Sequence, residues 1–385
     1  MRREAALDRR NFLKTSLAGG LAAVAAARLP GMAAAAEGSP AAAGQGPAAR
    51  VVLTAGDDRA ANTLRGLKPF AKEIGQAIGD RLVVIKPNNV AIDNQLSATH
   101  ADCIAGILEF LKSIGKIGNV MIAESAANGP TLDGFANFGY PRVAAKYGVK
   151  LVDLDQAGHK LVHVVDDRDF RPHAVRISRV LLDPGTFIIS AAKMKTHDRV
   201  VATLSLKNVI FGAPIKDLGF SWGPNAKPGL KTDKPIAHGG GFRGINFNLF
   251  ALAQRLRPHL AVIDGYDGME GNGPTMGKAV DHRVCVVGSD WLAADRVAVE
   301  LMGIDFAKIG YLNYCAQAGL GEADLKKIEI LGEPLARHVR PYKLADNIEQ
   351  QMIWRKPPAA NGAQRHAPRG PHYHIAATWE PVQLG

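Results

Sequence analysis

The sequence contains little cysteine, and this shortage excludes one class of redox centre. Only Cys103, Cys285 and Cys315 occur among the 385 residues, and no two of them form a C-x-x-C pair. An iron–sulfur cluster needs about four cysteine thiolates. The chain therefore cannot hold such a cluster by itself, and we expect its cysteines to fill the core.

Aromatic residues, nucleotide motifs and long apolar runs are scarce as well. Aromatic residues make up 6% of the chain and the basic residues are scattered, so nucleic acid is a poor candidate partner. The chain has neither a G-x-G-x-x-G motif after a strand nor a Walker lysine motif, which argues against the ordinary nucleotide sites. No run approaches the roughly 20 apolar residues of a membrane span, so we expect no permanent membrane anchor.

The N-terminus carries a pattern that is typical of export. Arg9 and Arg10 form a twin-arginine pair, an apolar stretch rich in Ala and Gly follows, and the small residues 34–36 offer a cleavage site. This pattern predicts a signal peptide over residues 1–36. We therefore expect the Tat translocase to export the chain, and the mature protein to be periplasmic or otherwise exported.

The rest of the chain divides into a linker, one domain and a tail. Residues 37–49 are rich in Ala, Gly and Pro and predict a linker, whereas residues 336–385 predict an irregular, basic and Pro-rich tail. Between them, residues 50–335 form one predicted α/β domain. The net charge of the chain is +11, and residues 1–36 contribute +4 of it, which leaves +7. This balance favours an anionic small molecule as the ligand.

Short apolar runs alternate with amphipathic segments along the predicted domain. Five runs, which begin near residues 82, 120, 186, 260 and 284, predict buried strands, and helical patterns lie between most of them. The alternation predicts a mostly parallel but mixed sheet with helices on both faces, in three layers. Residues 212–244 are rich in Gly and Pro, and we expect them to form a long loop over the carboxyl ends of the strands.

Polar groups follow each of the five predicted strands. The densest group is Lys193, Lys195 and His197, which share one face of an extended segment, with Lys207 and Asn208 about ten residues further on. Because the carboxyl ends of parallel strands form ligand sites, groups far apart in sequence can converge there. Convergent ammonium groups suit a carboxylate or a phosphate, and a desolvated lysine can act as a base or as a Schiff-base nucleophile.

Three acids accompany these cations. Glu124 and Asp264 follow predicted strands, and Glu270 lies in a Gly-rich stretch. Carboxylates beside a flexible backbone can bind a hard divalent cation or hold a general base. The sequence therefore suits a divalent metal without requiring one.

Seven short motifs, in this order, resemble a bacterial and archaeal family that is called domain of unknown function 362. The motifs are Ile85-Lys86-Pro87-Asn88, Thr99-His100, Ala123-Glu124-Ser125, Lys193-Met194-Lys195-Thr196-His197, Leu204-Ser205-Leu206-Lys207-Asn208, Asp264-Gly265 with Met269-Glu270-Gly271-Asn272-Gly273-Pro274, and Leu301-Met302-Gly303. The similarity covers roughly residues 83–333. It implies no established reaction. Some family members carry a ferredoxin-like module, but this chain lacks the necessary cysteines.

The strand ends and the family motifs together predict one polar cleft. We expect catalytic roles for Lys193, Lys195, His197, Glu124 and Asp264, and ligand-binding roles for Lys86, Asn88, Lys207, Asn208 and Glu270. The leading hypothesis is an exported enzyme, or a cofactor-loaded protein, that acts on an anionic small molecule. The alternatives are a non-catalytic periplasmic ligand-binding or assembly factor and, less favoured, a scaffold.

Overall fold

A computed structural model of the chain describes residues 48–222 and 226–356. The predicted signal peptide and most of the predicted linker and tail lie outside these residues. Within them, no helix combines the length and the apolar character that a membrane span needs.

The strands and helices follow one another largely as the sequence pattern predicts. The strands are β1 (Ala49–Ala55), β2 (Leu82–Pro87), β3 (Val120–Glu124), β4 (Lys150–Asp153), β5 (His159–Val165), β6 (Pro172–Ser178), β7 (Thr186–His197), β8 (Val201–Thr203), β9 (Leu260–Asn272), β10 (Met276–Gly288) and β11 (Ile328–Gly332). The α-helices are α2 (Arg59–Leu67), α3 (Ala71–Ile78), α4 (Ala101–Ser113), α5 (Thr131–Asn137), α6 (Tyr140–Tyr147), α7 (Ser205–Gly212), α8 (Lys234–Ala237), α9 (Phe242–Ala253), α10 (Trp291–Leu301), α11 (Gly310–Gln317) and α12 (Ile348–Gln351).

Nine of these strands form one mixed sheet. The order across it is β11-β1-β10-β9-β7-β2-β3-β4, and β8 pairs with the end of β7. The run from β9 through β7, β2 and β3 to β4 is parallel throughout, whereas β10 is antiparallel to both of its neighbours. The predicted α/β fold with a mostly parallel, mixed sheet is thus confirmed.

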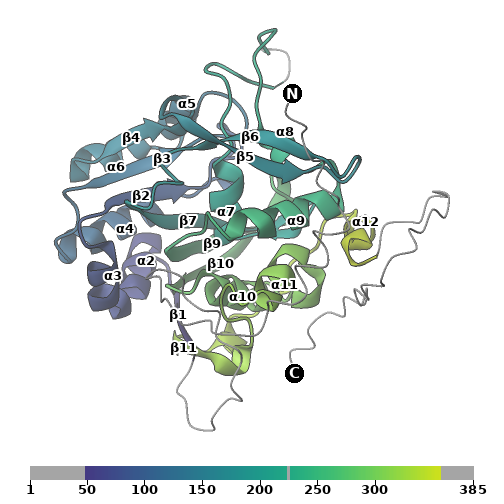
Figure 1. Cartoon of the computed structure of the whole chain (residues 1–385). Helices are drawn as coiled ribbons and strands as arrows, with labels where there is room; N and C mark the ends of the chain where they lie inside the picture. The colour runs from purple at the N-terminus through teal and green to yellow at the C-terminus, as the bar shows by residue number, and fades with distance from the viewer. Residues whose placement is uncertain (1–47, 223–225, 357–385) are drawn as a thin grey trace, which may run out of the picture. The chain divides into compact units, whose positions relative to one another are not determined.

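Side chains alternate between two cores along each strand, because successive residues of a strand point to opposite faces of the sheet. Val84 and Ile188 contribute to one core, with apolar residues of α7, α9, α10 and α11. Val83 and Ile85 contribute to the other, with residues of α2, α3, α4 and α6. Figure 1 shows these two groups of helices on opposite sides of the sheet, which confirms the three layers.

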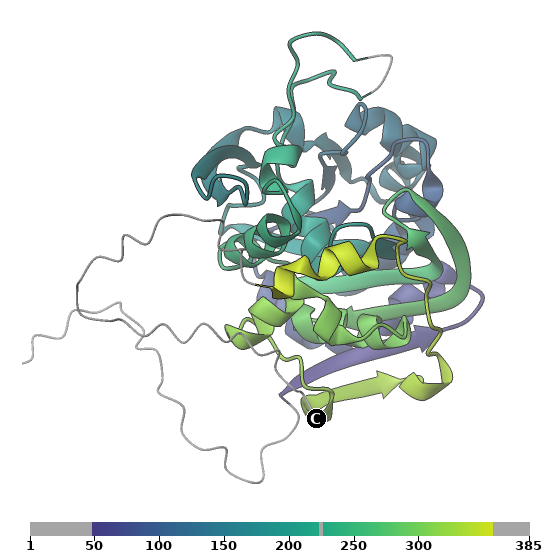
Figure 2. The ribbon, with the colours of Figure 1, turned by 90° about the vertical axis from the view of Figure 1, so that its right-hand side faces the viewer.

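The β9–β10 hairpin brings a turn close to the end of β7. Both strands have 13 residues, and Figure 2 shows the long hairpin beside β1 and β11. A Cβ added at Gly273 would lie 2.0 Å from the Thr196 carbonyl oxygen. Only glycine permits this approach, which places the neighbouring Pro274 at the pocket described below.

The folded domain continues beyond residue 335, where the sequence predicts an irregular tail. Residues 336–356 contain little regular structure, yet Tyr342 and Gln351 are buried. Gln351 accepts a hydrogen bond from the Val201 amide and donates one to the His197 carbonyl oxygen. Because these contacts join residues about 150 positions apart, no local periodicity in the sequence reveals them.

Candidate functional site

A buried ion pair lies at the carboxyl ends of β2 and β3. Lys86 Nζ donates to Glu124 Oε2 over 2.6 Å and to Asn208 Oδ1 over 2.9 Å. Glu124 also accepts hydrogen bonds from the Asn89 and Ser125 amides. The Lys86 and Glu124 side chains are 0% and 2% exposed. Protein donors therefore engage both oxygens of this carboxylate.

The ion pair is closely packed as well as buried. Burial lowers the pKa of Lys86 and raises the pKa of Glu124, while the contact between the two favours both charges. A Cβ at Gly212 would lie 2.0 Å from Lys86 Cε and 2.7 Å from Glu124 Oε1. The last residue of α7 must therefore be glycine to leave room for the pair.

Helix α7 is fixed at its start by α10 and further along by β2 and β7. At its start, the Asp295 carboxylate accepts hydrogen bonds from the Ser205 and Leu206 amides. Further along, Asn208 Nδ2 donates to the Lys86 carbonyl oxygen and to Ser190 Oγ. The side-chain hydrogen bonds of Asn208 thus hold α7 against β2 and β7. The preceding residue of the helix, Lys207, lines the adjacent pocket.

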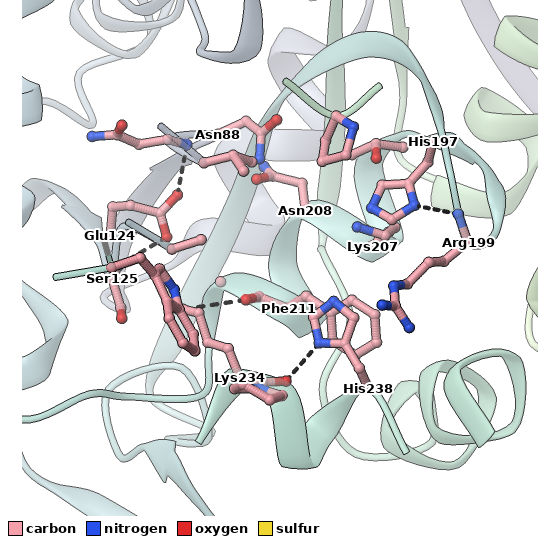
Figure 3. A pocket seen from close by; sticks show the side chains of 18 of the residues that line it. Asn88, Glu124, Ser125, His197, Arg199, Lys207, Asn208, Phe211, Lys234 and His238 are labelled. Carbon is pink, nitrogen blue, oxygen red and sulfur yellow. Dashed lines mark hydrogen bonds between the residues drawn. The ribbon is translucent and has the colours of Figure 1, made fainter. Parts of the chain in front are cut away.

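The pocket has a volume of about 440 Å³, which lies in the range of small-molecule sites. Figure 3 shows Lys207, His197 and Arg199 at one side of it and Glu124 and Ser125 at the other. Its lining comes from the strand ends, α7 and the segment 212–244. The full set is Asn88, Asn89, Val90, Glu124, Ser125, Ala127, Arg168, His197, Arg199, Thr203, Lys207, Asn208, Phe211, Gly212, Trp222, Lys234, Pro235, His238, Gly240 and Pro274.

Positive charge dominates this lining. Lys207 and Lys234 are 6% and 5% exposed, and burial lowers the pKa of each to about 7. Arg199 adds a guanidinium group at a more exposed position, and Arg168, also exposed, is already paired with Asp166. Glu124 is the one acidic residue among the described residues of the lining, and Lys86 already compensates its charge. The pocket is therefore built to attract an anion.

Two neutral histidines offer opposite hydrogen-bonding groups. His238 Nδ1 lies 2.5 Å from the Lys234 carbonyl oxygen, so this nitrogen must donate and Nε2 is left as an acceptor. His197 Nδ1 accepts a hydrogen bond from the Arg199 amide, so its proton is on Nε2. Burial lowers the pKa of His238 to about 3 and that of His197 well below its usual value. Both rings are thus uncharged at neutral pH.

Two adjacent amide side chains have polar atoms without a partner. Asn88 Oδ1 and both terminal atoms of Asn89 are buried and make no hydrogen bond to any described residue. Both residues belong to the pocket lining. Because an unsatisfied buried polar group is costly, such atoms call for an explanation, and a bound ligand or water is one.

A second cluster of charged side chains, separate from the Lys86–Glu124 pair, lies between the neighbouring strands β7 and β9. Lys193 and Asp264 are paired in register, and Lys193 Nζ lies 3.8 Å from Asp264 Oδ2. Arg59 Nε lies 3.3 Å from Asp264 Oδ1. Although burial opposes the charge, Lys193 and Arg59 lower the pKa of Asp264. This carboxylate is therefore held as an anion between two cations.

The ten predicted residues consequently do not share a single cleft. The pocket lining includes Asn88, Glu124, His197, Lys207 and Asn208, and Lys86 lies directly behind it. Lys193 and Asp264 belong to the second cluster, Lys195 Nζ donates to the Ser97 carbonyl oxygen, and Glu270 accepts from the Lys343 amide. The three predicted acids thus lie apart, and within residues 48–222 and 226–356 no three His, Cys, Asp or Glu side chains gather as metal ligands do.

Some pocket residues have no signal in the sequence. Lys234, Arg199 and Arg168 lie in stretches without strand or helix periodicity, and His238 is only an isolated histidine there. The Gly/Pro-rich composition of residues 212–244 is the one hint, since long loops in compact domains are usually functional. Six lining residues come from this segment: Gly212, Trp222, Lys234, Pro235, His238 and Gly240.

Comparison with known proteins agrees with the motifs described above. A thylakoid-associated protein of Synechocystis sp. is 23% identical over 285 residues, which cover 74% of this chain and 80% of that protein. The family model described as "Domain of unknown function (DUF362)" matches residues 83–300, a range that runs from β2 into α10 and contains all the lining residues of the pocket. The chain therefore belongs to the DUF362 family.

Proposed function

We propose that this protein is exported and that it binds an anionic small molecule in the pocket beside α7. One observation supports the proposal above all others. Lys207, Lys234 and Arg199 line this pocket without an ion pair to any described residue, while the acidic residue of the lining, Glu124, is already paired with Lys86. The fourth basic residue, Arg168, is paired with Asp166. An anion would restore the charge of Lys207 and Lys234, which burial makes costly.

Replacing Lys207 with glutamine is expected to weaken binding of a small anion roughly 10- to 100-fold, the value of one charge-assisted hydrogen bond. Isothermal titration calorimetry with sulfate and with pyruvate at pH 6.5 measures this effect. Lys343→Gln is the matched control, because Lys343 is 70% exposed and lies away from the pocket; its affinity should stay within about twofold of wild type. Equal affinities of the two variants would contradict the proposal.

Export rests on the twin-arginine pattern at Arg9 and Arg10. We expect the exported protein to begin near residue 37, and Arg9→Lys combined with Arg10→Lys to leave an uncleaved precursor in the cytoplasm. Mass spectrometry of the N-terminus after cell fractionation tests this. An uncleaved chain that is exported equally well with both lysines would contradict the proposed route.

The pocket suits either an enzyme or a ligand carrier. A carrier needs only partners for the anion, and Arg199 and Lys234 supply these. Lys207 adds a nearly buried amine that hydrogen-bonds to no described residue. Such a group is unnecessary for simple capture and favours catalysis.

A further inference from the structure

Lys207 differs from the other buried lysines near the sheet edge in having neither a hydrogen-bond acceptor nor an ion-pair partner among the described residues. Lys193 also lacks an acceptor, but its Nζ lies 3.8 Å from Asp264 Oδ2. Lys86 donates to Glu124, Lys195 to the Ser97 carbonyl oxygen, and Lys234 to the Phe211 and Pro214 carbonyl oxygens. The Lys207 amine instead lies 5.1 Å from the centroid of the Phe211 ring and lines the pocket. Its nitrogen is thus accessible to a bound molecule.

The same surroundings keep part of this amine neutral. Burial, together with repulsion from Lys86 and Lys234, lowers the pKa of Lys207 to about 7 despite the attraction of Asp198. About half of the molecules then carry a neutral amine with a free lone pair at pH 7. A neutral amine is nucleophilic, whereas a protonated one is not.

Other groups of the pocket would hold a carboxylate next to this amine. Arg199 and Lys234 line the pocket with Lys207, and the planar guanidinium of Arg199 matches the geometry of a carboxylate. The neutral His197 presents Nε2–H as a donor. A molecule that carries a carboxylate and a carbonyl group close together matches this arrangement.

We infer that Lys207 forms a Schiff base with the carbonyl carbon of a small oxo acid bound in this pocket. This inference rests on the proposed anion binding and adds a substrate class and a catalytic residue to it. The amine lone pair forms a carbon–nitrogen bond while the carbonyl π electrons move to oxygen. Protons pass from nitrogen to oxygen, water leaves, and the imine remains. The sum is amine plus carbonyl to imine plus water, without an oxidant or a reductant.

Reductive trapping tests the inference on the full exported protein. Pyruvate and 2-oxoglutarate are the probes, and cyanoborohydride at pH 7 reduces any imine to a stable secondary amine. Peptide mass spectrometry should find the adduct at Lys207 at least tenfold above that at the exposed Lys343, and excess sulfate should suppress it. Lys207→Arg keeps the positive charge without the nucleophile, so it should retain sulfate binding and lose the adduct.

The possible failures are distinguishable. If sulfate and pyruvate bind but Lys207 is labelled no faster than Lys343, the Schiff base is refuted and anion binding stands. The Schiff base is also refuted if excess sulfate does not suppress the labelling of Lys207. It is refuted as well if Lys207→Arg forms as much total adduct, at other lysines, as the wild type does. If neither anion binds, the inference falls together with the proposed function.

Discussion

Replacing Glu124 with alanine is expected to lower the free energy of unfolding by about 3–5 kcal/mol, because it leaves a charged group buried without its partner. Lys86 is 0% exposed, and the Asn89 and Ser125 amides would lose their acceptor at the same time. Urea denaturation followed by circular dichroism measures the change. We expect this to be among the largest effects of any single substitution in the domain.

The double variant Lys86→Met with Glu124→Leu supplies the control. Removing both charges removes the desolvation cost as well, so the double variant should be more stable than Glu124→Ala and lie within about 2 kcal/mol of wild type. The Arg50–Glu73 pair, whose side chains are 43% and 42% exposed, is the matched surface pair; Glu73→Ala should cost at most about 1 kcal/mol. If Glu73→Ala and Glu124→Ala lower the free energy of unfolding equally, the result would contradict the stabilising role assigned to the buried Lys86–Glu124 pair.

The affinity of the pocket for sulfate is expected to fall roughly 100-fold between pH 6 and pH 8, about tenfold for each of two lysines. The pKa values of Lys207 and Lys234 are each lowered to about 7 by burial. Both side chains are therefore mostly charged at pH 6 and mostly neutral at pH 8. Sulfate binds the charged forms, so its affinity is full below pH 7 and is lost as the pH rises. Sulfate is the right probe because its own charge does not change in this range.

Two controls separate this effect from unfolding and from other groups. Lys207→Arg carries a permanent charge, so its affinity should fall only about tenfold over the same range. Between pH 7 and 10.5, the ordinary pKa of lysine, these two side chains bind more protons in the unfolded chain than in the folded one. The free energy of unfolding therefore increases as the pH rises through this range. Loss of binding at pH 8 therefore does not reflect unfolding. A flat affinity profile would contradict the assigned protonation.

The sequence predicts the layers of the fold and the edge of the sheet at which polar groups gather. The apolar runs around Val84 and Ile188 correspond to β2 and β7, because strand periodicity is a local property that burial on both faces reinforces. The position of Lys86 and Glu124 at strand ends follows from the same pattern. The pairing of these two side chains does not, since it depends on the neighbouring order of β2 and β3 in the sheet.

The residues predicted for a single cleft divide between the pocket and a buried charge cluster for a physical reason. Lys193 and Asp264 point toward each other across β7 and β9, so their charges compensate one another instead of a ligand. Conversely, Lys234 and Arg199 enter the pocket from segments without periodicity, and only tertiary structure places them there. The polar residues at the strand ends therefore predict one side of the pocket, and the segments without sequence periodicity supply the rest of its lining.

The central claim is that an anion binds among Lys207, Lys234 and Arg199, and anomalous diffraction tests it most directly. Crystals of the exported protein soaked with selenate below pH 7 should show an anomalous selenium peak in the pocket, within hydrogen-bonding distance of Lys207 Nζ. An empty pocket at saturating selenate, or selenium peaks found only at other surfaces, would contradict the account.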